Sequence, residues 1–234
     1  TQKPLELLKR IIKASSDEGD LILDPFCGCG TTIDAAIELN RKWIGIDITH
    51  LAISLINYRI NDKYGNSIKY LEKGLPEDLA SAYKLAHQDR YVFQDWILGR
   101  LRAKPLGDIK KGADEGIDGR KYFRDNPDKN DCKEIIIQVK SGHVGVKDIR
   151  ELITVKNKNN ATIGALVTLE EPTYPMKKEA LSEGFYISNL KNYKCHKIQI
   201  LTVNDLLKGK GIDYISIADL TFKKAAKHID RLFN

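Results

Sequence analysis

Hydrophobic residues in the first third of the chain follow helical and strand-like spacings in turn. In residues 5–12 the apolar positions recur at helical intervals, and Pro4 suits the first turn of a helix. A mainly apolar stretch such as 21–26 is typical of a buried strand. The expected strands are 21–26, 42–48 and 67–71, and the expected helices are 5–12, 32–39 with Thr31 as its cap, and 49–60. Strands separated by helices predict a parallel α/β sheet.

The rest of the chain alternates in the same way, with longer strands. Residues 73–78 mark a boundary, so we expect two α/β domains, 1–74 and 75–234. The expected helices are 79–102 with a break near Asp89, 146–156 and 175–182, and the expected strands are 120–124, 134–140, 163–169 and 197–203. Residues 104–119 are rich in Gly, Lys and Asp and are expected to form a loop, and the polar residues 125–131 are expected to turn between two strands.

Composition and charge narrow the class of protein. The 234 residues are 42% hydrophobic, which is enough for a packed core. No apolar run approaches the ~20 residues of a membrane span, so we expect no membrane partner. Residues 1–74 contain 10 basic and 10 acidic residues, whereas residues 75–234 contain 28 and 22 and therefore hold the whole net charge of +6. This basic excess fits a polyanionic partner.

The cysteines indicate the redox state of the cell compartment, and residues 1–4 indicate how the chain begins. A single Cys-x-Cys pair is a poor zinc signal, so we expect Cys27, Cys29, Cys132 and Cys195 to be free thiols in a reducing cytoplasm. Residues 1–4 have no signal-peptide pattern. They also lack an initiator Met, so we do not expect residue 1 to be the natural start of the gene product.

Two glycines lie between a predicted strand and a predicted helix in the first part. Gly28 and Gly30 allow the backbone to bend sharply and a ligand to approach it closely. The helix N-terminus behind them offers free N–H groups. Asp47 ends the next strand, where a carboxylate can accept hydrogen bonds from both ribose hydroxyls. The alternative is an ordinary turn of an α/β domain.

The wider pattern resembles the amino-methylating DNA methyltransferases over residues 1–73. It consists of Thr1-Gln2-Lys3-Pro4, Asp24-Pro25-Phe26-Cys27-Gly28-Cys29-Gly30-Thr31-Thr32 and Gly45-Ile46-Asp47. The resemblance implies that the second string surrounds the methionine part of S-adenosylmethionine, through Asp24, Phe26, Gly28 and Gly30. It implies that Asp47 binds the ribose.

The sequence also lacks two features of that family. Its catalytic string is Asp, Ser or Asn followed by Pro-Pro and an aromatic residue, but no two of the seven prolines here are adjacent. At most three of its roughly seven strands are recognisable. We therefore expect a methyltransferase remnant with an incomplete cofactor pocket and no methyltransferase activity of its own. Such a short sheet needs cover from the second domain, a second copy of the chain, or the missing methyltransferase half.

The second part carries a pattern that suits phosphodiester chemistry. Alternation along the strand 134–140 places Gln138 and Lys140 on one face, and a hairpin can bring Asp118 beside them. Hydrolysis of a phosphodiester needs a hard cation held by oxygen ligands, an activated water and positive charge for the transition state. The ligands are expected to be the Asp118 carboxylate, the Gln138 side-chain oxygen and the Val139 carbonyl. Lys140 would orient the water or neutralise charge.

This pattern resembles the Mrr-like branch of the PD-(D/E)xK nucleases, in which Gln replaces the usual acid of the second strand. The resemblance covers about residues 85–205 and extends to Asp89-Arg90-Tyr91-Val92-Phe93-Gln94, Val146-Lys147-Asp148-Ile149-Arg150 and Gly184-Phe185-Tyr186. It implies a restriction-endonuclease-like α/β fold and magnesium-dependent hydrolysis of DNA. Fusion to a methyltransferase type implies a restriction–modification system of a prokaryotic cytoplasm.

Several neighbouring residues have both a functional and a plain interpretation. Asp114 and Glu115 are metal ligands or loop carboxylates, and Gln94 lies near the metal site or faces solvent. Lys147 forms a solvated i,i+4 pair with Glu151, or contacts DNA phosphates together with Arg150. Tyr91, Phe93 and Trp96 are expected in the core. Two other functions stay open: a DNA-binding module that does not cleave, and a regulatory piece that binds S-adenosylmethionine.

Overall fold

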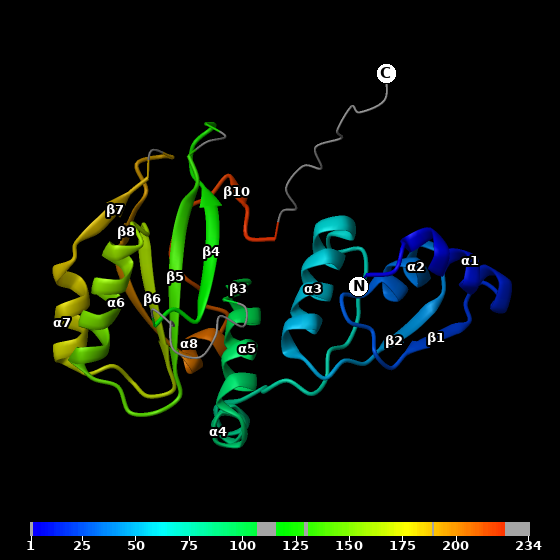
Figure 1. The fold of residues 1–234 in the computed structure, drawn as a ribbon, viewed down its shortest axis with the longest axis horizontal. Helices are drawn as coiled ribbons and strands as arrows, with labels where there is room; N and C mark the ends of the chain where they lie inside the picture. Colours follow the sequence, from blue (N-terminus) through cyan, green and yellow to red (C-terminus); the bar gives the residue numbers. More distant parts are fainter. Residues whose placement is uncertain (1, 107–115, 129–130, 189, 223–234) are drawn as a thin grey trace. The chain divides into compact units, whose positions relative to one another are not determined.

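The chain forms two compact units (Figure 1). The computed structural model describes residues 2–106, 116–128, 131–188 and 190–222. The first unit comprises Thr1–Arg102 and Val203–Lys210, and the second comprises Ala103–Thr202 and Gly211–Asn234. Both units mix helices with strands, which confirms the predicted α/β class.

The first unit is built on a parallel pair of strands. Strand β1 (Leu21–Asp24) pairs with β2 (Lys42–Gly45) along its whole length, from Leu21 opposite Lys42 to Asp24 opposite Gly45. The helices of this unit are α1 (Leu5–Ser15), α2 (Thr31–Glu38), α3 (His50–Tyr64), α4 (Leu79–Gln88), α5 (Arg90–Arg100) and α8 (Val203–Leu207). The predicted strand–helix–strand order is confirmed, because β1, α2 and β2 follow one another.

Two predictions for the short sheet are wrong. Residues 67–71, all of them described, form no strand, and the Tyr70 ring instead packs on Trp43 with centroids 5.8 Å apart. The strand at 21–26 is not buried on both faces: Ile22 packs against the helices, whereas Leu21 and Leu23 on the other face are each 58% exposed. On β2, Ile44 is exposed as well. The helices of this unit therefore leave one face of β1–β2 open.

Polar side chains cap the starts of helices α3, α4 and α5. Asp89 ends α4 and caps α5, because its Oδ1 accepts hydrogen bonds from the backbone N–H groups of Tyr91 and Val92. The predicted break near Asp89 is thereby confirmed. Phe93 and Trp96 of α5 are buried as predicted, but Tyr91 is 60% exposed and does not belong to the core. The cap of α2 also differs from the prediction.

Gly30, not Thr31, is the N-cap of α2. Its φ of 80° lies in the left-handed region that favours glycine. A Cβ at this position would lie 2.7 Å from Ile56 Cγ1, so the glycine also lets α3 approach the turn. Ile56 belongs to the small core of Cys27, Ile33, Ile56 and Ile60. The packing against Ile56 thus explains why position 30 is a glycine, whether or not a ligand binds at this turn.

Gly30→Ala is expected to destabilise the protein by about 1–3 kcal/mol, since it combines overpacking with an unfavourable φ. Gly19→Ala is the matched control, because Gly19 has a φ of 87° but nothing within 4 Å of its added Cβ. Urea unfolding should show a larger loss for Gly30→Ala than for Gly19→Ala. Equal losses would mean that the contact with Ile56 contributes nothing.

The second unit contains a mixed sheet with strand order β10-β4-β5-β6-β9, and β3 also pairs with β4. The strands are β3 (Lys104–Pro105), β4 (Gly119–Arg124), β5 (Lys133–Lys140), β6 (Ile163–Thr168), β9 (Ile198–Thr202) and β10 (Ala218–Asp219). β4 and β5 form the predicted antiparallel hairpin, whereas β5, β6 and β9 are parallel. β3 lies in a stretch that was expected to be loop only.

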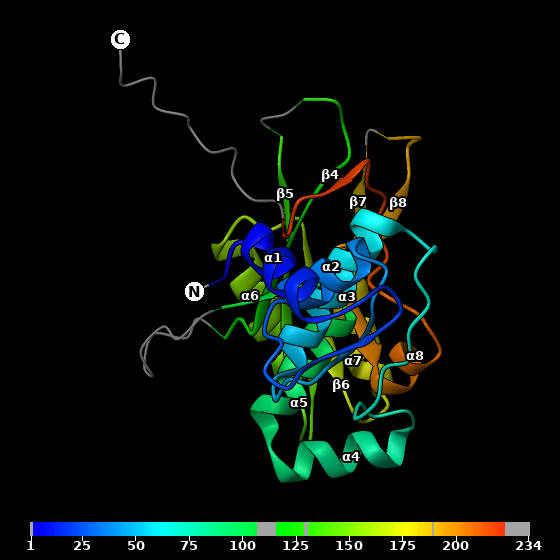
Figure 2. The ribbon, with the colours of Figure 1, turned by 90° about the vertical axis from the view of Figure 1, so that its right-hand side faces the viewer.

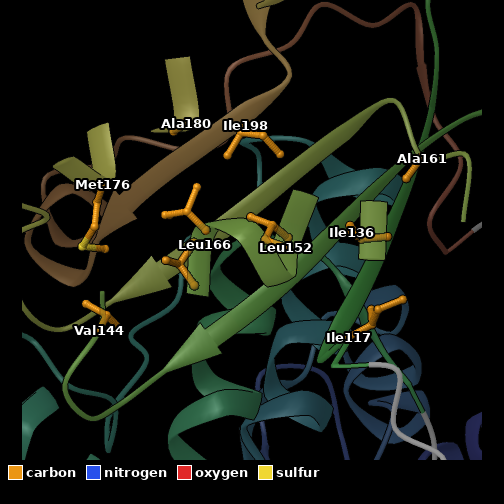
Figure 3. Packing of buried hydrophobic residues seen from close by; sticks show 10 residues of the cluster. Ile117, Ile136, Val144, Leu152, Ala161, Leu166, Met176, Ala180 and Ile198 are labelled. Atoms are coloured by element: carbon orange, nitrogen blue, oxygen red, sulfur yellow. The ribbon is translucent and has the colours of Figure 1, made fainter. Parts of the chain in front are cut away.

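Helices α6 (Val146–Lys158) and α7 (Tyr174–Ser182) pack on one face of this sheet. Figure 3 shows Leu152 of α6 and Met176 of α7 meeting Ile136 and Leu166 of the strands. Side chains alternate along a strand, so Gln138 and Lys140 lie on the same face of β5 as Ile136. That face is the one covered by α6.

A small antiparallel hairpin of this unit was not predicted. It pairs β7 (Phe185–Ile187) with β8 (Lys194–His196), as Figure 2 shows. Both strands have three residues, too few for alternation to be recognised. Within the described residues, no helix has the length and apolar character needed to cross a membrane.

Candidate active site

Asp118 is held against β5 by its own backbone and side chain. Its N–H donates to the Ile137 carbonyl at 2.9 Å, and its Oδ2 accepts from the Val139 N–H at 2.6 Å. The β4–β5 pairing ends at Gly119 opposite Ile137, so this carboxylate takes the place of the next pairing residue. The structure thus places Asp118 against the backbone of β5 between Ile137 and Val139, on the strand that carries Gln138 and Lys140. The Val139 carbonyl points to the same side of β5 as its N–H.

Gln138 is fully buried and only half satisfied. Its Nε2 donates to the Gly116 carbonyl, but its Oε1 has no hydrogen-bond partner among the described residues. A buried polar atom without a partner costs about 1–3 kcal/mol. A cation would satisfy this oxygen. Together with the Asp118 carboxylate and the Val139 carbonyl, it makes a set of oxygen donors that fits a hard divalent ion.

Lys140 ends β5 and reaches the start of α6. Its Nζ lies 3.6 Å from Asp148 Oδ1, and Asp148 Oδ2 accepts from the Gly145 N–H at 2.8 Å. Asp148 therefore satisfies the N–H of the N-cap residue of α6 and orients Lys140 at once. Sequence reasoning gave Asp148 no role. The signal available was an acid three residues after a glycine at a helix start, a common capping arrangement.

The other candidate residues have both a structural and a functional interpretation, and the structure places most of them. Arg150 is paired with Glu179, whose Oε1 lies 2.7 Å from its Nε, so it is not free for phosphate in this state. Lys147 is exposed and forms no ion pair among the described residues, so the expected pair with Glu151 is absent. Gln94 lies on α5, in the first unit. Asp114 and Glu115 lie outside the described residues.

No cluster of three or more His, Cys, Asp or Glu side chains that could hold a metal occurs in the described ranges. The candidate centre would therefore rely on an amide and a carbonyl oxygen as well as on carboxylates. All four cysteines are free, as predicted.

In the first unit, Asp47 ties the end of β2 to the glycine turn. Its Oδ2 accepts from the Gly28 N–H at 2.8 Å, and its Oδ1 accepts from the Thr49 N–H and hydroxyl at 2.9 Å. Burial would raise the pKa of Asp47, but the hydrogen bonds from Thr49 and Gly28 lower it overall. Asp47 is therefore an ionised carboxylate whose oxygens already serve the fold. This arrangement leaves less capacity for ribose hydroxyls than the sequence suggests.

The rest of the turn faces open space. Asp24 Oδ1 accepts from the Phe26 N–H at 3.1 Å, and the Phe26 side chain is 87% exposed. Gly28 has nothing within 4 Å of an added Cβ. The structure therefore brings Asp24, Gly28 and Asp47 to one turn, while the Phe26 side chain is left largely exposed.

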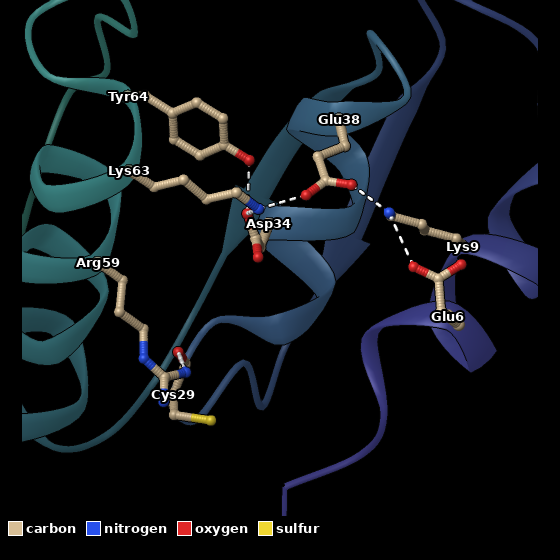
Figure 4. A network of polar contacts seen from close by, with 8 residues as sticks. All are labelled: Glu6, Lys9, Cys29, Asp34, Glu38, Arg59, Lys63 and Tyr64. Atoms are coloured by element: carbon tan, nitrogen blue, oxygen red, sulfur yellow. Dashed lines mark hydrogen bonds and ion pairs between the residues drawn. The ribbon is translucent and has the colours of Figure 1, made fainter. Parts of the chain in front are cut away.

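A polar network holds the helices around this turn (Figure 4). Glu38 of α2 pairs with both Lys9 of α1 and Lys63 of α3, and these hydrogen bonds hold the pKa of Glu38 below its usual value. Arg59 of α3 donates to the Cys29 carbonyl at 2.6 Å. The turn thus keeps its shape through contacts within the unit.

Comparison with known proteins assigns both parts. A family profile described as "Restriction endonuclease", of the Mrr catalytic type, matches residues 85–208, just over half of the chain. The chain belongs to this restriction endonuclease family. A profile described as "DNA methylase" matches residues 1–58, so a fragment of an N6/N4 DNA methylase precedes the restriction endonuclease domain. Both predicted resemblances are confirmed.

The curated relatives are DNA methyltransferases. The restriction endonuclease chain is 33% identical over 119 residues to the type II methyltransferase M.EcaI of Enterobacter cloacae, covering 47% of this chain and 26% of the relative. It is 62% identical over 48 residues to the DNA adenine methyltransferase YhdJ of Escherichia coli K12, covering 20% of this chain and 16% of the relative. The chain thus spans about a quarter or less of these relatives.

Proposed function

We propose that this restriction endonuclease domain hydrolyses phosphodiester bonds of double-stranded DNA in a prokaryotic cytoplasm with a divalent cation such as Mg²⁺. Asp118, Gln138 and Lys140 would form its catalytic centre. The observation that carries the proposal is the buried Gln138 Oε1, which has no hydrogen-bond partner among the described residues and belongs to the residue before Val139, whose N–H holds the Asp118 carboxylate. An oxygen without a partner at this place fits a centre that is completed by a cation.

The residues present suit each requirement of the reaction. Asp118, Gln138 Oε1 and the Val139 carbonyl would hold the cation, which supplies Lewis-acid charge stabilisation and an activated water when bound. The hydrogen bond from the Val139 N–H fixes the orientation of the Asp118 carboxylate. Lys140 brings an ammonium group to the end of β5, where it can neutralise negative charge that develops on phosphate. The ion pair with Asp148 holds Lys140 in this position.

The test is plasmid cleavage by the purified chain, with Mg²⁺ and with a chelator. Methylated and unmethylated plasmids should be compared, because a methylase fragment in the same chain makes target methylation the natural variable. Nicking that requires the cation is the expected result. DNA binding without nicking in either condition would favour the alternative of a binding module that uses the same pocket as a phosphate grip.

The methylase fragment is not expected to transfer methyl groups in this chain alone. The Pro-Pro catalytic string is absent from the sequence, and the sheet of the first unit has two strands with an exposed face. Incubation with labelled S-adenosylmethionine and DNA should leave the DNA unlabelled. Incorporation of label by this chain would contradict the expectation.

Weak binding of S-adenosylmethionine is compatible with the turn that holds Asp24, Phe26, Gly28, Gly30 and Asp47. Calorimetric titration should give heat that Asp47→Ala removes and that Asp62→Ala, an exposed control on α3, retains. Absence of heat in the parent would argue against a cofactor role and against the regulatory alternative.

The open face of β1–β2 suggests a partner for the fragment. We propose that the other half of a methyltransferase domain covers Leu21, Leu23 and Ile44, because the chain matches only 26% of the length of M.EcaI and 16% of that of YhdJ. Co-expression with that half should yield a complex, and Leu23→Lys should weaken it. A stable dimer of this chain alone, detected by light scattering, would favour a second copy instead.

A further inference from the structure

Glu151 of α6 lies beside the proposed nuclease centre. A Cβ built on Gly116 would lie 2.9 Å from Glu151 Oε1 and 3.1 Å from Gln138 Nε2. The carboxylate from the helix and the amide from β5 thus meet at the same glycine, two residues before Asp118. The expected partner of Glu151 in the sequence was Lys147, but the described residues contain no such ion pair.

The second observation is the state of Gln138. Its Nε2 donates to the Gly116 carbonyl, which brings its whole amide group to the place that Glu151 reaches. The other end of the same amide, Oε1, is buried and has no hydrogen-bond partner among the described residues. Glu151 is exposed, whereas the Gln138 oxygen is buried without a partner among the described residues. A cation bound at this place would complement both the carboxylate and the amide oxygen.

The charges around the centre also point to a cation. Gln138 is neutral, so Asp118 is the only carboxylate among the proposed ligands. Asp148 is already engaged by Lys140 and by the Gly145 N–H. A second carboxylate has to come from another element, and Glu151 is the acid that α6 directs there. Its neighbours Ile149 and Leu152 are fully buried and fix the helix against the sheet.

We propose that Glu151 is the second carboxylate of the nuclease centre and ligates the same divalent cation as Asp118. This inference rests on the proposed function. It assigns to α6 the acid that the second strand lacks, and it gives Gly116 a reason to be glycine. A side chain at Gly116 would fill the space between Glu151 and Gln138. The left-handed φ of 71° at Gly116 favours glycine as well.

The test is Mn²⁺ binding by the full chain. Binding is measured from the electron paramagnetic resonance signal of the Mn²⁺ that stays free. Glu151→Gln keeps the size of the side chain and removes its charge. It should weaken Mn²⁺ binding at least about tenfold, since loss of outer-shell contacts alone typically costs 10–100-fold. Asp128→Asn is the matched control, because Asp128 is exposed in the β4–β5 turn, at the opposite end of β5 from Lys140. It should leave binding unchanged.

The Mn²⁺ concentration for half-maximal plasmid nicking gives a second readout, and Glu151→Gln should raise it in parallel. If the parent nicks DNA but Glu151→Gln and Asp128→Asn bind Mn²⁺ equally well, Glu151 is not a ligand, while the nuclease function stands. Slower nicking by Glu151→Gln with an unchanged Mn²⁺ requirement would also overturn the proposal, since it indicates that Glu151 only positions Gln138. A parent that neither binds Mn²⁺ nor nicks DNA would overturn the proposed function and this inference together.

Discussion

Asp118→Asn and Lys140→Ala are each expected to lower metal-dependent plasmid nicking by about 10³-fold or more, while the chain stays folded. Asp118→Asn retains an oxygen that can accept the Val139 N–H, so it removes the charge and preserves the hydrogen bond seen at 2.6 Å. The loss would therefore report on the cation. Lys140→Ala removes the ammonium group that would neutralise the transition state in the proposed centre. Nicking rates under matched Mg²⁺ and DNA concentrations measure both effects.

DNA binding separates the two roles. Lys140→Ala should bind DNA nearly as well as the parent, because the contribution proposed for Lys140 lies in the transition state. Asp118→Ala is expected to bind DNA somewhat better in the absence of metal, since a carboxylate that faces phosphates is repulsive. Lys178→Ala, an exposed change on α7, controls for the loss of one positive charge. If folded Asp118→Asn and Lys140→Ala both cut like the parent, the assigned centre is wrong.

A substitution at Gln138 can add charge to the proposed centre, whereas the variants above remove it. Gln138→Glu adds the acid found in most nucleases of the PD-(D/E)xK type at this place. If Glu151 already supplies the second carboxylate, the variant would bring a third negative charge to a buried position. We then expect retained activity with a shifted metal preference, measured as the ratio of Mn²⁺- to Mg²⁺-supported nicking.

The nuclease hairpin could be predicted because its determinants are local. The alternation in residues 134–140 fixes which side chains share a face, and the polar turn 125–131 fixes the antiparallel return. Asp118 then has to lie near Val139, as the pairing of Gly119 with Ile137 shows. Helix breaks such as Asp89 are predictable for the same reason, since a capping side chain acts on its own neighbours.

The misses have a different physical origin. An apolar run such as 21–26 shows what a folded partner would bury, but it carries no information on whether the partner is present, and Leu21 and Leu23 are exposed. The i,i+4 spacing predicted an ion pair between Lys147 and Glu151, which is wrong. The direction of the Glu151 side chain depends instead on how α6 lies on the sheet. Tyr91 is exposed because helix α5 buries one side only. Each of these outcomes is set by tertiary contacts beyond the local sequence.

DNA binding by the full chain is expected to fall by more than two orders of magnitude for each tenfold rise in salt. The basic excess lies in residues 75–234, where 28 basic residues face 22 acidic ones. Each phosphate neutralised contributes about 0.9 to the slope of log affinity against log salt, so about four contacts suffice. Fluorescence anisotropy with a duplex across a decade of NaCl concentration measures this slope. A flat profile would exclude an electrostatic footprint.

The same slope tests which basic residues of α6 touch phosphate. Lys147 is exposed and has no ion-pair partner among the described residues, so Lys147→Ala should reduce the slope by about 0.9 if it binds one phosphate. Arg150 is held by Glu179 at 2.7 Å, and a DNA contact would have to break that pair. Arg150→Ala should therefore change the slope less than Lys147→Ala does. Glu179→Gln should release Arg150 and steepen the salt dependence, whereas an unchanged slope in all three variants would mean that this face of α6 lies away from DNA.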